Sequence, residues 1–319
     1  MSDIKLFRLI KGQATELQGD ASDLEKPLQT LIENNLLQLL GIRFLATEYS
    51  TGKTHAGRID TLGVDENDCP VIIEYKRSVG ENVINQGLFY LDWLMDHQAE
   101  FKLLVTDKLG KTDADRIDWS APRLVCIAAD FTKYDAHAVQ QIGRDIELIR
   151  YRMFGDDLLL LESANTTSTA SAKPKKAAKV IVKSASGDKS FAEWQESIPH
   201  PLRELLVSVE DYIVSFGDDV QRKELKLYVA YKRLKNFATI VLQKNRLVLY
   251  LHLNPDQIMP LPSFGRDARQ FGHWGTGDLE LSISNPSEFE LAKPLIRMAY
   301  EGRGIAVEPQ ELSKISSVI

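Results

Sequence analysis

The chain has 319 residues, a formal net charge of −6 at pH 7, and hydrophobic and charged fractions of 44% and 26%. These values are typical of a soluble globular protein and leave room for two domains, each with its own core. Its two cysteines, Cys69 and Cys126, are too few for a disulfide framework or a zinc site and fit a reducing compartment. Because the N-terminus lacks a signal-peptide pattern and no stretch approaches about 18 apolar residues, we expect a cytoplasmic protein without a membrane span.

The charge is divided unevenly along the chain. Residues 1–162 carry 18 basic and 27 acidic residues, residues 163–190 carry six lysines and one aspartate, and residues 191–319 carry 15 basic and 17 acidic residues. A net-acidic protein is poorly suited to cover nucleic acid without regard to its sequence. Any attraction of phosphate must therefore come from local patches and from the lysine-rich segment.

The first 162 residues alternate between helical and extended patterns. Apolar residues at helical spacing predict helices over residues 22–40, 82–101 and 135–142. Alternating or continuous apolar runs predict strands over residues 5–10, 42–49, 58–64, 71–76, 123–129 and 146–154, with 103–106 open to either structure. Residues 158–161 close the unit. This order predicts an α/β domain over residues 1–162, built on a mixed sheet flanked by helices.

The remainder of the chain predicts a linker and a second domain. Residues 163–190 are rich in serine, alanine and lysine and cannot bury enough apolar surface to fold, so we expect a flexible linker. The pattern beyond it predicts helices over residues 202–216 and 287–302 and strands over 224–231, 238–253 and 279–283, the middle one a hairpin that turns at Lys244-Asn245. Residues 191–319 are thus predicted to form a small α+β domain.

Strands 58–64 and 71–76 flank a cluster of turn-forming residues and predict a β-hairpin. If the turn is centred on residue 67, Asp60 lies directly opposite Glu74. Because alternate side chains of a strand point to opposite faces, Lys76 shares a face with Glu74. The hairpin thus predicts two carboxylates about 5 Å apart with an ammonium group beside them.

Two like charges that face each other destabilise a sheet unless a cation lies between them, and Mg²⁺ commonly takes one or two carboxylates while it keeps water ligands for a phosphate. The alternative is an exposed hairpin with ordinary acidic residues. Against this alternative, Glu74 follows three apolar residues, where an unpaired charge is costly. We therefore expect Asp60 and Glu74 to bind Mg²⁺ or Mn²⁺ for phosphodiester hydrolysis.

Lys76 has two interpretations. It would orient the attacking water or stabilise the charge on the pentacovalent phosphorus, which makes it a catalytic residue. Alternatively, it only neutralises Asp60 or Glu74 in an ion pair. A point charge on a flexible side chain suits either role, so the residue alone does not decide between them.

The arrangement of Asp60, Glu74 and Lys76, after a helix that carries another acidic residue, resembles the PD-(D/E)xK nuclease superfamily. The segment GRIDTLGVDENDCPVIIEYKR is a more specific signature than these three residues. It is similar to the RecB-like catalytic domain of the NucS-type endonucleases, which cleave branched or mismatched DNA. The resemblance covers roughly residues 20–160. It implies a PD-(D/E)xK restriction-endonuclease-like fold, and it implies the backbone carbonyl of Tyr75 as a further metal ligand.

The resemblance also identifies Glu25 as the acidic residue of the helix, because Glu25 lies 23 residues before Glu48, which is the spacing that the family shows. Two alternatives stay open. Glu25 could form a capping box with Ser22, and Glu33 on the same helix could take its place.

Gln86 and Tyr90 are spaced four residues apart and share one helix face. The resemblance places this pair beside the acidic residues, where both would hold the carboxylates or a phosphate as part of the catalytic site. An ordinary core position is the alternative for Tyr90.

Residues 191–319 resemble an uncharacterised domain that is often fused to such nucleases, and this resemblance implies no function. Lys232, Arg233 and Lys235, next to Tyr231 and Phe237, could form a basic and aromatic nucleic-acid face, or only an exposed strand edge. Arg58 in the first domain is a further candidate for contact with nucleic acid. The glycine-rich stretch 271–277 predicts turns rather than a phosphate loop, and the six histidines have no metal-ligand spacing.

We therefore expect a Mg²⁺- or Mn²⁺-dependent nuclease that cleaves DNA, an endonuclease of DNA repair or of defence against foreign DNA. The alternative is a catalytically silent module that retains the nuclease fold and binds nucleic acid or protein. Branched, mismatched and single-stranded DNA are the candidate substrates. Substrate recognition, partner binding and homodimerisation are all compatible with the second domain.

Overall fold

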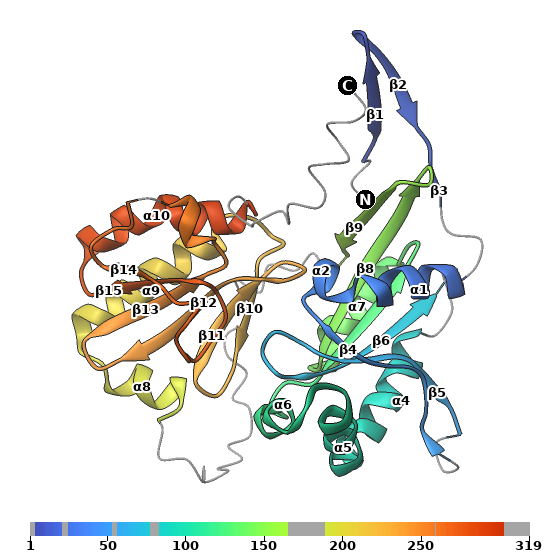
Figure 1. The fold of residues 1–319 in the computed structure, drawn as a ribbon, viewed down its shortest axis with the longest axis horizontal. Coiled ribbons are helices and arrows are strands. Elements are labelled where there is room, and N and C mark those ends of the chain that lie inside the picture. The colour runs from blue at the N-terminus through green and yellow to red at the C-terminus, as the bar shows by residue number, and fades with distance from the viewer. Residues whose placement is uncertain are drawn as a thin grey trace. The chain divides into compact units, whose positions relative to one another are not determined.

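The computed structural model describes residues 4–20, 25–52, 56–76, 83–164, 189–258 and 260–302. The chain divides into two compact units, Met1–Thr166 and Thr167–Ile319, each with its own sheet (Figure 1). The predicted linker, residues 163–190, lies almost wholly outside the described residues. In the part of the chain that is described, no helix has the length and apolar character needed to cross a lipid bilayer.

The first unit is built on a seven-stranded mixed sheet with the order β3-β8-β7-β6-β5-β4, and β9 pairs with β8. Strands β6, β7 and β8 run parallel, whereas β4, β5 and β6 run antiparallel. The strands are β3 (Gly19–Asp20), β4 (Arg43–Ser50), β5 (Arg58–Val64), β6 (Pro70–Lys76), β7 (Arg123–Ala128), β8 (Asp145–Phe154) and β9 (Leu158–Ser163). The predicted fold class, a mixed sheet flanked by helices, is confirmed.

Helices cover both faces of this sheet. They are α1 (Glu25–Asn34), α2 (Leu36–Leu40), α4 (Val83–Asp96), α5 (Gln98–Leu109), α6 (Lys111–Arg116) and α7 (Lys133–Ile142). On one face, Leu62, Ile72 and Leu124 of the strands share a core cluster with apolar residues of α4, α5 and α7. On the other face, Thr61 donates a hydrogen bond to Glu33 of α1. Alternate strand positions therefore face different helices, as the pleat requires.

Two predicted helices are each divided in the structure. The helix predicted over residues 22–40 is interrupted at Asn35, and the helix predicted over 82–101 is interrupted at His97. The His97 ring stacks on Trp93 at 4.8 Å, and its Nδ1 lies 2.8 Å from the Trp93 carbonyl oxygen, so the side chain competes for a helical acceptor. Residues 103–106, which the sequence left open, belong to α5.

The N-terminal strand is part of a hairpin that the sequence predicted only in part. β1 (Leu6–Ile10) corresponds to the predicted strand 5–10, and it pairs with β2 (Gln13–Leu17) in a separate two-stranded sheet. Lys11 and Gly12 form the turn with positive φ angles of 49° and 82°. In Figure 1 this hairpin extends away from the helices and the sheet of the first unit.

A buried ion network holds the turn between β5 and β6. Arg123 donates to both carboxylate oxygens of Glu147 at 2.8 and 3.0 Å and to Asp65 Oδ2 at 3.0 Å. Asp65 Oδ1 in turn accepts from the backbone N–H groups of Asn67 and Cys69, both at 2.9 Å. All three charged side chains are at most 6% exposed. One guanidinium therefore connects the hairpin turn to β7 and β8.

The β5–β6 register is the predicted one. Thr61 pairs with Ile73, and Val64 pairs with Pro70. One step further along the same register, Asp60 lies opposite Glu74.

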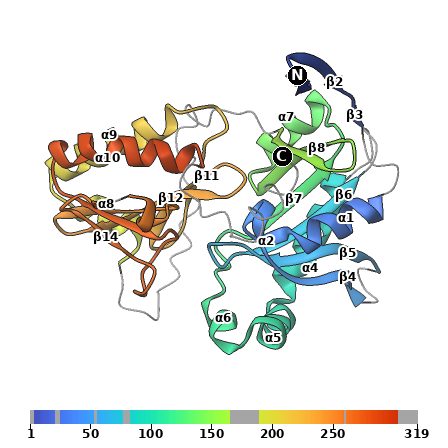
Figure 2. The ribbon, with the colours of Figure 1, turned by 45° about the horizontal axis from the view of Figure 1, so that its top comes forward.

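The second unit has a six-stranded antiparallel sheet with the order β10-β11-β12-β13-β15-β14. Its elements are α8 (Phe191–Ser197), α9 (His200–Val214), β10 (Gln221–Glu224), β11 (Tyr228–Lys232), β12 (Asn236–Gln243), β13 (Arg246–Leu251), η2 (Pro255–Gln257), β14 (Gly265–Asp267), β15 (Leu279–Ile283) and α10 (Pro286–Tyr300). Figure 2 shows α9 and α10 together on one face of this sheet, over its core.

The α+β class of the second unit is also as predicted, and its hairpin turns at Lys244-Asn245. The single strand predicted over residues 224–231 was wrong, because β10 ends at Glu224 and β11 begins at Tyr228. The N–H of Leu225 donates to the carbonyl of Tyr228, so a tight turn separates two antiparallel strands.

We predict that Arg123→Leu destabilises the first unit by about 3–5 kcal/mol, because it leaves the buried carboxylates of Glu147 and Asp65 without their cation. Arg116→Leu is the matched control. Arg116 is 59% exposed, and its ion pair with Asp68 is expected to contribute at most about 1 kcal/mol. Urea unfolding of both variants measures the difference, and equal losses would contradict a dominant role of the buried network.

Candidate active site

Asp60 and Glu74 are linked through each other's backbone. Glu74 Oε1 accepts from the N–H of Asp60 at 3.2 Å, and Asp60 Oδ2 accepts from the N–H of Tyr75 at 3.0 Å. These two hydrogen bonds extend the pairing of β5 and β6 beyond Thr61. Their acceptors are side-chain oxygens, whereas a regular sheet would use backbone carbonyl oxygens. The arrangement fixes both carboxylates at the end of the hairpin that lies away from the turn.

Glu74 is fully buried, and its Oε2 has no hydrogen-bond partner among the residues that the structure describes. Burial, and after it the charge of Asp60, raise the pKa of Glu74 to about 9 against the opposing effects of the N–H of Asp60 and the ammonium of Lys76. In the absence of a cation, Glu74 therefore holds a proton at neutral pH. A bound cation would take the place of that proton.

Burial also raises the pKa of Asp60, against the N–H of Tyr75 and the charge of Lys76. Lys76 is half-buried, and its charge opposes the rise in pKa of both Asp60 and Glu74. The charges of Glu48 and Glu25 raise the pKa of Asp60 as well. Several carboxylates thus interact within one site, and carboxylate oxygens are the ligands that a hard divalent cation prefers.

The structure separates the two candidate acidic residues of α1. Glu25 is the first residue of the helix, and its charge acts on Asp60. Glu33 instead accepts from Thr61 Oγ1 at 2.6 Å and from Gln29 Nε2 at 3.0 Å, on the sheet face that also holds the Tyr75 hydroxyl. Ser22, the alternative capping partner of Glu25, lies outside the described residues.

Glu48, which the sequence analysis used only as the spacing reference for Glu25, is itself a site residue. In β4, Thr47 pairs with Thr61 and Tyr49 with Ile59, so Glu48 lies beside Asp60, where it adopts the left-handed conformation with φ 50°. A non-glycine residue in this conformation costs about 1–3 kcal/mol, and such strain concentrates at functional sites. The residue was predicted as part of an ordinary strand, and nothing in the local sequence signals the irregularity.

Two basic residues hold the Glu48 carboxylate. Lys26 Nζ lies 3.0 Å and Arg58 Nε 3.5 Å from its oxygens. The charge of Glu48 raises the pKa of Glu74 as well as that of Asp60. Arg58 is 70% exposed and lies next to the acids, where the sequence predicted a contact with nucleic acid.

Gln29 is a second residue that the sequence analysis missed. It is only 4% exposed, and its Nε2 lies 2.8 Å from the backbone oxygen of Asp60 and 3.1 Å from Thr47 Oγ1. The amide thus joins α1 to β4 and β5 at the acidic site. Its four-residue spacing from both Glu25 and Glu33 places all three side chains on one helix stripe, a signal that could have revealed it.

Gln86 and Tyr90 hold the start of β5. Gln86 Nε2 donates to the Tyr90 hydroxyl at 3.4 Å, and the same oxygen accepts from the N–H of Arg58 at 3.3 Å. A Cβ on Gly57 would lie 2.6 Å from this hydroxyl, so glycine is needed there for close approach. The described hydrogen bonds of the pair lead to the backbone just before Asp60, which indicates a positioning role.

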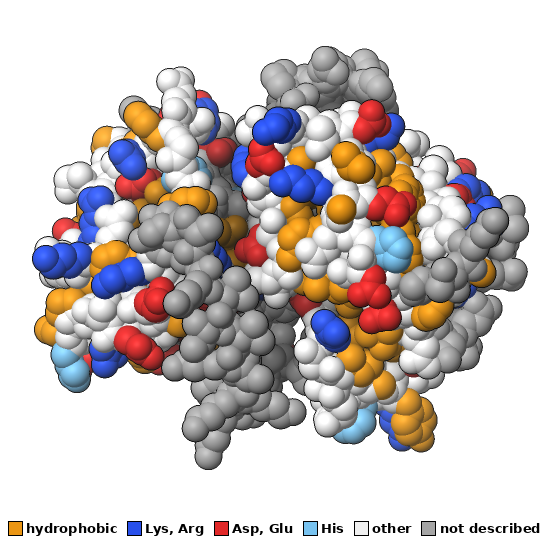
Figure 3. All heavy atoms as spheres, turned by 90° about the horizontal axis from the view of Figure 1, so that it is seen from below, with side chains coloured by type: hydrophobic (Ala, Val, Ile, Leu, Met, Phe, Trp, Pro, Cys, Tyr) orange, Lys and Arg blue, Asp and Glu red, His pale blue; other side chains and the backbone are white. Residues whose placement is uncertain are grey.

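The basic residues of the second unit do not form the predicted face with aromatic residues. Tyr231 and Phe237 belong to the buried core cluster, so that expectation was wrong for both. Lys232 is 3% exposed, and Arg233 Nε lies 2.5 Å from Asp219. Basic and acidic side chains are interspersed on the face of the molecule in Figure 3. Burial, and after it the charge of Lys235, lower the pKa of His252, and Lys235 stays a candidate for contact with nucleic acid.

The glycine-rich stretch 271–277 packs against the sheet. The N–H of Thr276 donates to Thr239 Oγ1 at 3.2 Å, and its hydroxyl lies 2.9 Å from His252 Nε2 and accepts from Asn236 at 3.0 Å. Gly277 has φ 129°, and a Cβ there would lie 2.8 Å from the Leu251 backbone. This stretch is therefore an anchored turn, as expected, and not a phosphate cradle.

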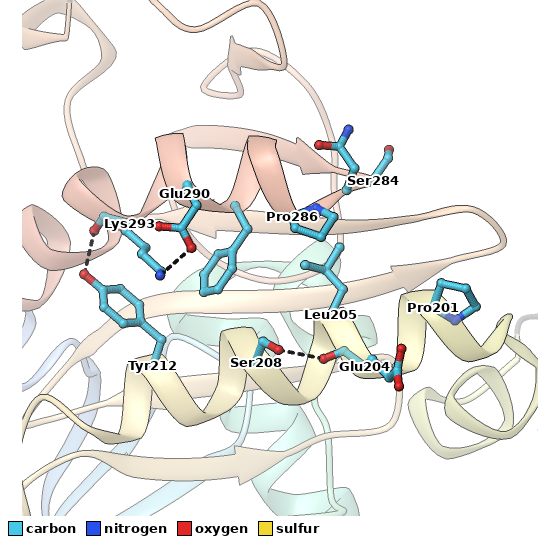
Figure 4. A pocket seen from close by; sticks show the side chains of 11 residues that line it. Pro201, Glu204, Leu205, Ser208, Tyr212, Ser284, Pro286, Glu290 and Lys293 are labelled. Atoms are coloured by element: carbon cyan, nitrogen blue, oxygen red, sulfur yellow. Dashed lines mark hydrogen bonds and ion pairs between the residues drawn. The ribbon is translucent and has the colours of Figure 1, made fainter.

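A cavity of about 630 Å³ lies between α9 and α10 of the second unit (Figure 4). Its lining includes Lys293, whose Nζ bonds Glu290 at 2.6 Å and lies 4.9 Å from the centroid of the Phe289 ring. A ligand there would meet a cation that is already paired. The acidic site of the first unit is thus the stronger candidate for chemistry.

The donor set fits a hard divalent ion. Within the described ranges, no group of three or more histidine, cysteine or acidic side chains is arranged to hold a metal. Two carboxylates are sufficient for Mg²⁺, which keeps its water ligands, and the partnerless Oε2 of Glu74 is a buried oxygen in need of a cation or proton. The N–H of Tyr75 points to Asp60, and because both backbone groups of a strand residue face one edge, its carbonyl faces the same edge.

Comparison with known proteins gives a family without a known function for the second unit. Residues 192–302 match the model of a domain of unknown function, DUF5655. An uncharacterized protein of Haemophilus influenzae is 29% identical over 314 residues, which are 93% of this chain and 99% of that protein.

Two solved structures show a limited likeness that covers 41% of this chain. A repair endonuclease from Pyrococcus abyssi matches at 19% identity with a TM-score of 0.26, and the structure of an EndoMS-dsDNA2 complex matches at 18% identity with a TM-score of 0.23. The chain spans 49% and 48% of their lengths, respectively. TM-scores this low carry no inference about fold or activity, so the geometry of the site carries the functional argument.

We predict that Glu74→Gln stabilises the metal-free protein at alkaline pH. A carboxyl group with a raised pKa keeps a proton in the folded protein that the unfolded chain releases, so stability falls as pH rises from about 4.3 towards 9. Glutamine removes this dependence. The variant is expected to exceed the parent by at least about 1.4 kcal/mol at pH 8, the free energy of one pKa unit, and to match it near pH 4.

Urea unfolding in EDTA at several pH values measures this effect. Asp107→Asn is the control, because Asp107 is 72% exposed and is expected to leave the pH profile unchanged. A parent protein whose stability relative to the variant does not change between pH 5 and 8 would show that Glu74 ionises normally.

Proposed function

We propose that the first unit is a Mg²⁺- or Mn²⁺-dependent nuclease that hydrolyses DNA phosphodiester bonds. The observation that carries this proposal is the pair Asp60 and Glu74, interlocked across β5 and β6, with Lys76 beside both and a buried carboxylate oxygen without a partner. A folded protein retains a buried, unpaired acidic group at a cost in stability, and a role in function accounts for that cost.

Asp60, Glu74 and the backbone carbonyl of Tyr75 would hold the ion. Once bound, it would lower the pKa of a water ligand and stabilise negative charge on the phosphate oxygens. The affinity of the site would rise with pH, since binding displaces the proton that Glu74 holds in the metal-free protein.

The surrounding residues would orient the reactants. Lys76, whose charge acts on both carboxylates, would hold the attacking water or an oxygen of the scissile phosphate. The exposed guanidinium of Arg58 would contact a neighbouring backbone phosphate of DNA. Gln86 and Tyr90 would be positioning residues, because their hydrogen bonds fix the backbone of Arg58.

The finer assignments belong to the same proposal. The substrate would be DNA that is branched, mismatched or single-stranded, cut internally, in repair or in defence against foreign DNA. The second unit would bind substrate or a partner. Cleavage rates on DNA of different structures and on RNA distinguish these substrates.

One observation favours a second candidate, a module that binds nucleic acid or protein without catalysis. Within the described residues, the acidic side chains do not form a group of three that could hold a metal, and Glu74 is neutral at pH 7. Calorimetric titration with Mn²⁺ distinguishes the two. Binding that is lost in Asp60→Asn and Glu74→Gln favours the nuclease, whereas absence of binding in the parent favours the silent module.

We predict that Asp60→Asn and Glu74→Gln each lower cleavage by about a thousandfold or more, because each removes a charge on which transition-state stabilisation depends. Lys76→Met is expected to lower the rate while Mn²⁺ binding stays intact. Initial rates are measured with Mn²⁺ on single-stranded, duplex, branched and mismatched DNA and on RNA.

Asp107→Asn again serves as the control, since it removes an exposed carboxylate far from the hairpin acids in the sequence. Its rates are expected to equal those of the parent. Cleavage by Asp60→Asn at the parental rate would indicate a contaminating nuclease and remove the proposal.

A further inference from the structure

The β1–β2 hairpin exposes large apolar side chains. Phe7, Leu9 and Ile10 are 51%, 73% and 60% exposed, and six of the ten strand residues are apolar. The pairs Phe7–Glu16 and Leu9–Ala14 place apolar groups on one face, and Ile10 lies on the other. Each face of the hairpin therefore exposes apolar side chains to solvent.

The hairpin also has unpaired edges. β1 and β2 pair only with each other among the described strands, so the outer edge of each presents backbone N–H and C=O groups. Two isolated strands are at best marginally stable in water, and independent stability needs a third strand or a packed apolar face. The geometry of the hairpin thus requires a surface that the described residues of its own unit do not provide.

The charges indicate what this surface is. Residues 4–17 carry three basic residues, Lys5, Arg8 and Lys11, and one acidic residue, so the hairpin is net +2. Residues 18–162 carry 15 basic and 25 acidic residues, net −10, whereas residues 191–319 are only net −2. The strongest complementary charge on this chain belongs to the first unit itself.

We propose that the β1–β2 hairpin is a dimerisation arm that packs against the first unit of a second copy of this chain. Its apolar side chains would be buried at the interface, and Arg8 and Lys11 would pair with acidic side chains of the partner's net-acidic first unit. Exchange of identical arms between two copies gives a closed assembly with two equivalent contacts. This interface does not depend on catalysis and goes beyond the proposed nuclease function.

Nucleic acid is the less favoured occupant of the hairpin. An arm that grips DNA offers mainly basic and polar side chains to phosphates and base edges, whereas most strand residues of this hairpin are apolar. The second unit of the same chain offers far less complementary charge than the first. Both alternatives give results in the test that differ from those expected of a dimer.

The experiment measures the mass of the full chain by sedimentation equilibrium over a wide range of concentration. The test variant is Phe7→Asp/Leu9→Asp, and Leu103→Asp is the matched control because Leu103 on α5 is 71% exposed, as Leu9 is 73%. The parent and the control are expected to be dimers and the test variant a monomer. Deletion of residues 1–17 should give the same monomer, and unchanged far-UV circular dichroism of the remaining protein checks its fold.

A charge variant adds an independent test. Arg8→Glu/Lys11→Glu keeps the apolar side chains and is expected to weaken dimerisation at least tenfold at low salt, with a smaller difference at high salt. A monomeric parent, or a Phe7→Asp/Leu9→Asp variant that remains dimeric, overturns the proposal. A monomeric parent whose hairpin amides resist hydrogen exchange would identify the second unit as the occupant, and protection that appears only with DNA would identify DNA.

Discussion

The geometry of the candidate site depends on the register between β5 and β6. A shift of one residue would move Asp60 away from Glu74 and turn its side chain to the opposite face. Arg123 opposes such a shift, because it binds Asp65 at the hairpin turn and Glu147 on β8 within one buried network. Charged groups at one end of the hairpin thus determine where two carboxylates meet at the other end.

Several features of the site are costly for the folded chain. Glu74 is buried with one oxygen unpartnered, Glu48 has a left-handed backbone, and the charges of Glu48 and Glu25 act against that of the largely buried Asp60. Each feature lowers the stability of the metal-free protein, and a divalent cation would relieve the burial and the repulsion together. This coincidence of costs at one place supports the proposed role of the site in binding a metal ion.

The two units differ in how helices cover their sheets. The first places helices on both faces of a mixed sheet, and its parallel strands β6 to β8 are buried. The second places its helices on one face of an antiparallel sheet and covers part of the other with an anchored glycine-rich turn. The N-terminal hairpin follows neither solution, since its apolar residues remain exposed within the described chain.

The sequence by itself determined the fold class, the hairpin register and the central pair of acidic residues, because strand alternation and turn chemistry are local. Tertiary structure decided the rest. In the folded chain, Glu33 accepts a hydrogen bond from Thr61, and Glu48 and Gln29 lie beside Asp60. Gln86 and Tyr90 are linked by hydrogen bonds to the backbone of β5. Helical spacing placed Gln29 on one stripe with Glu25 and Glu33 but did not predict its contact with Asp60. The outcomes depend on a strand irregularity and on contacts between distant segments, which local sequence patterns do not encode.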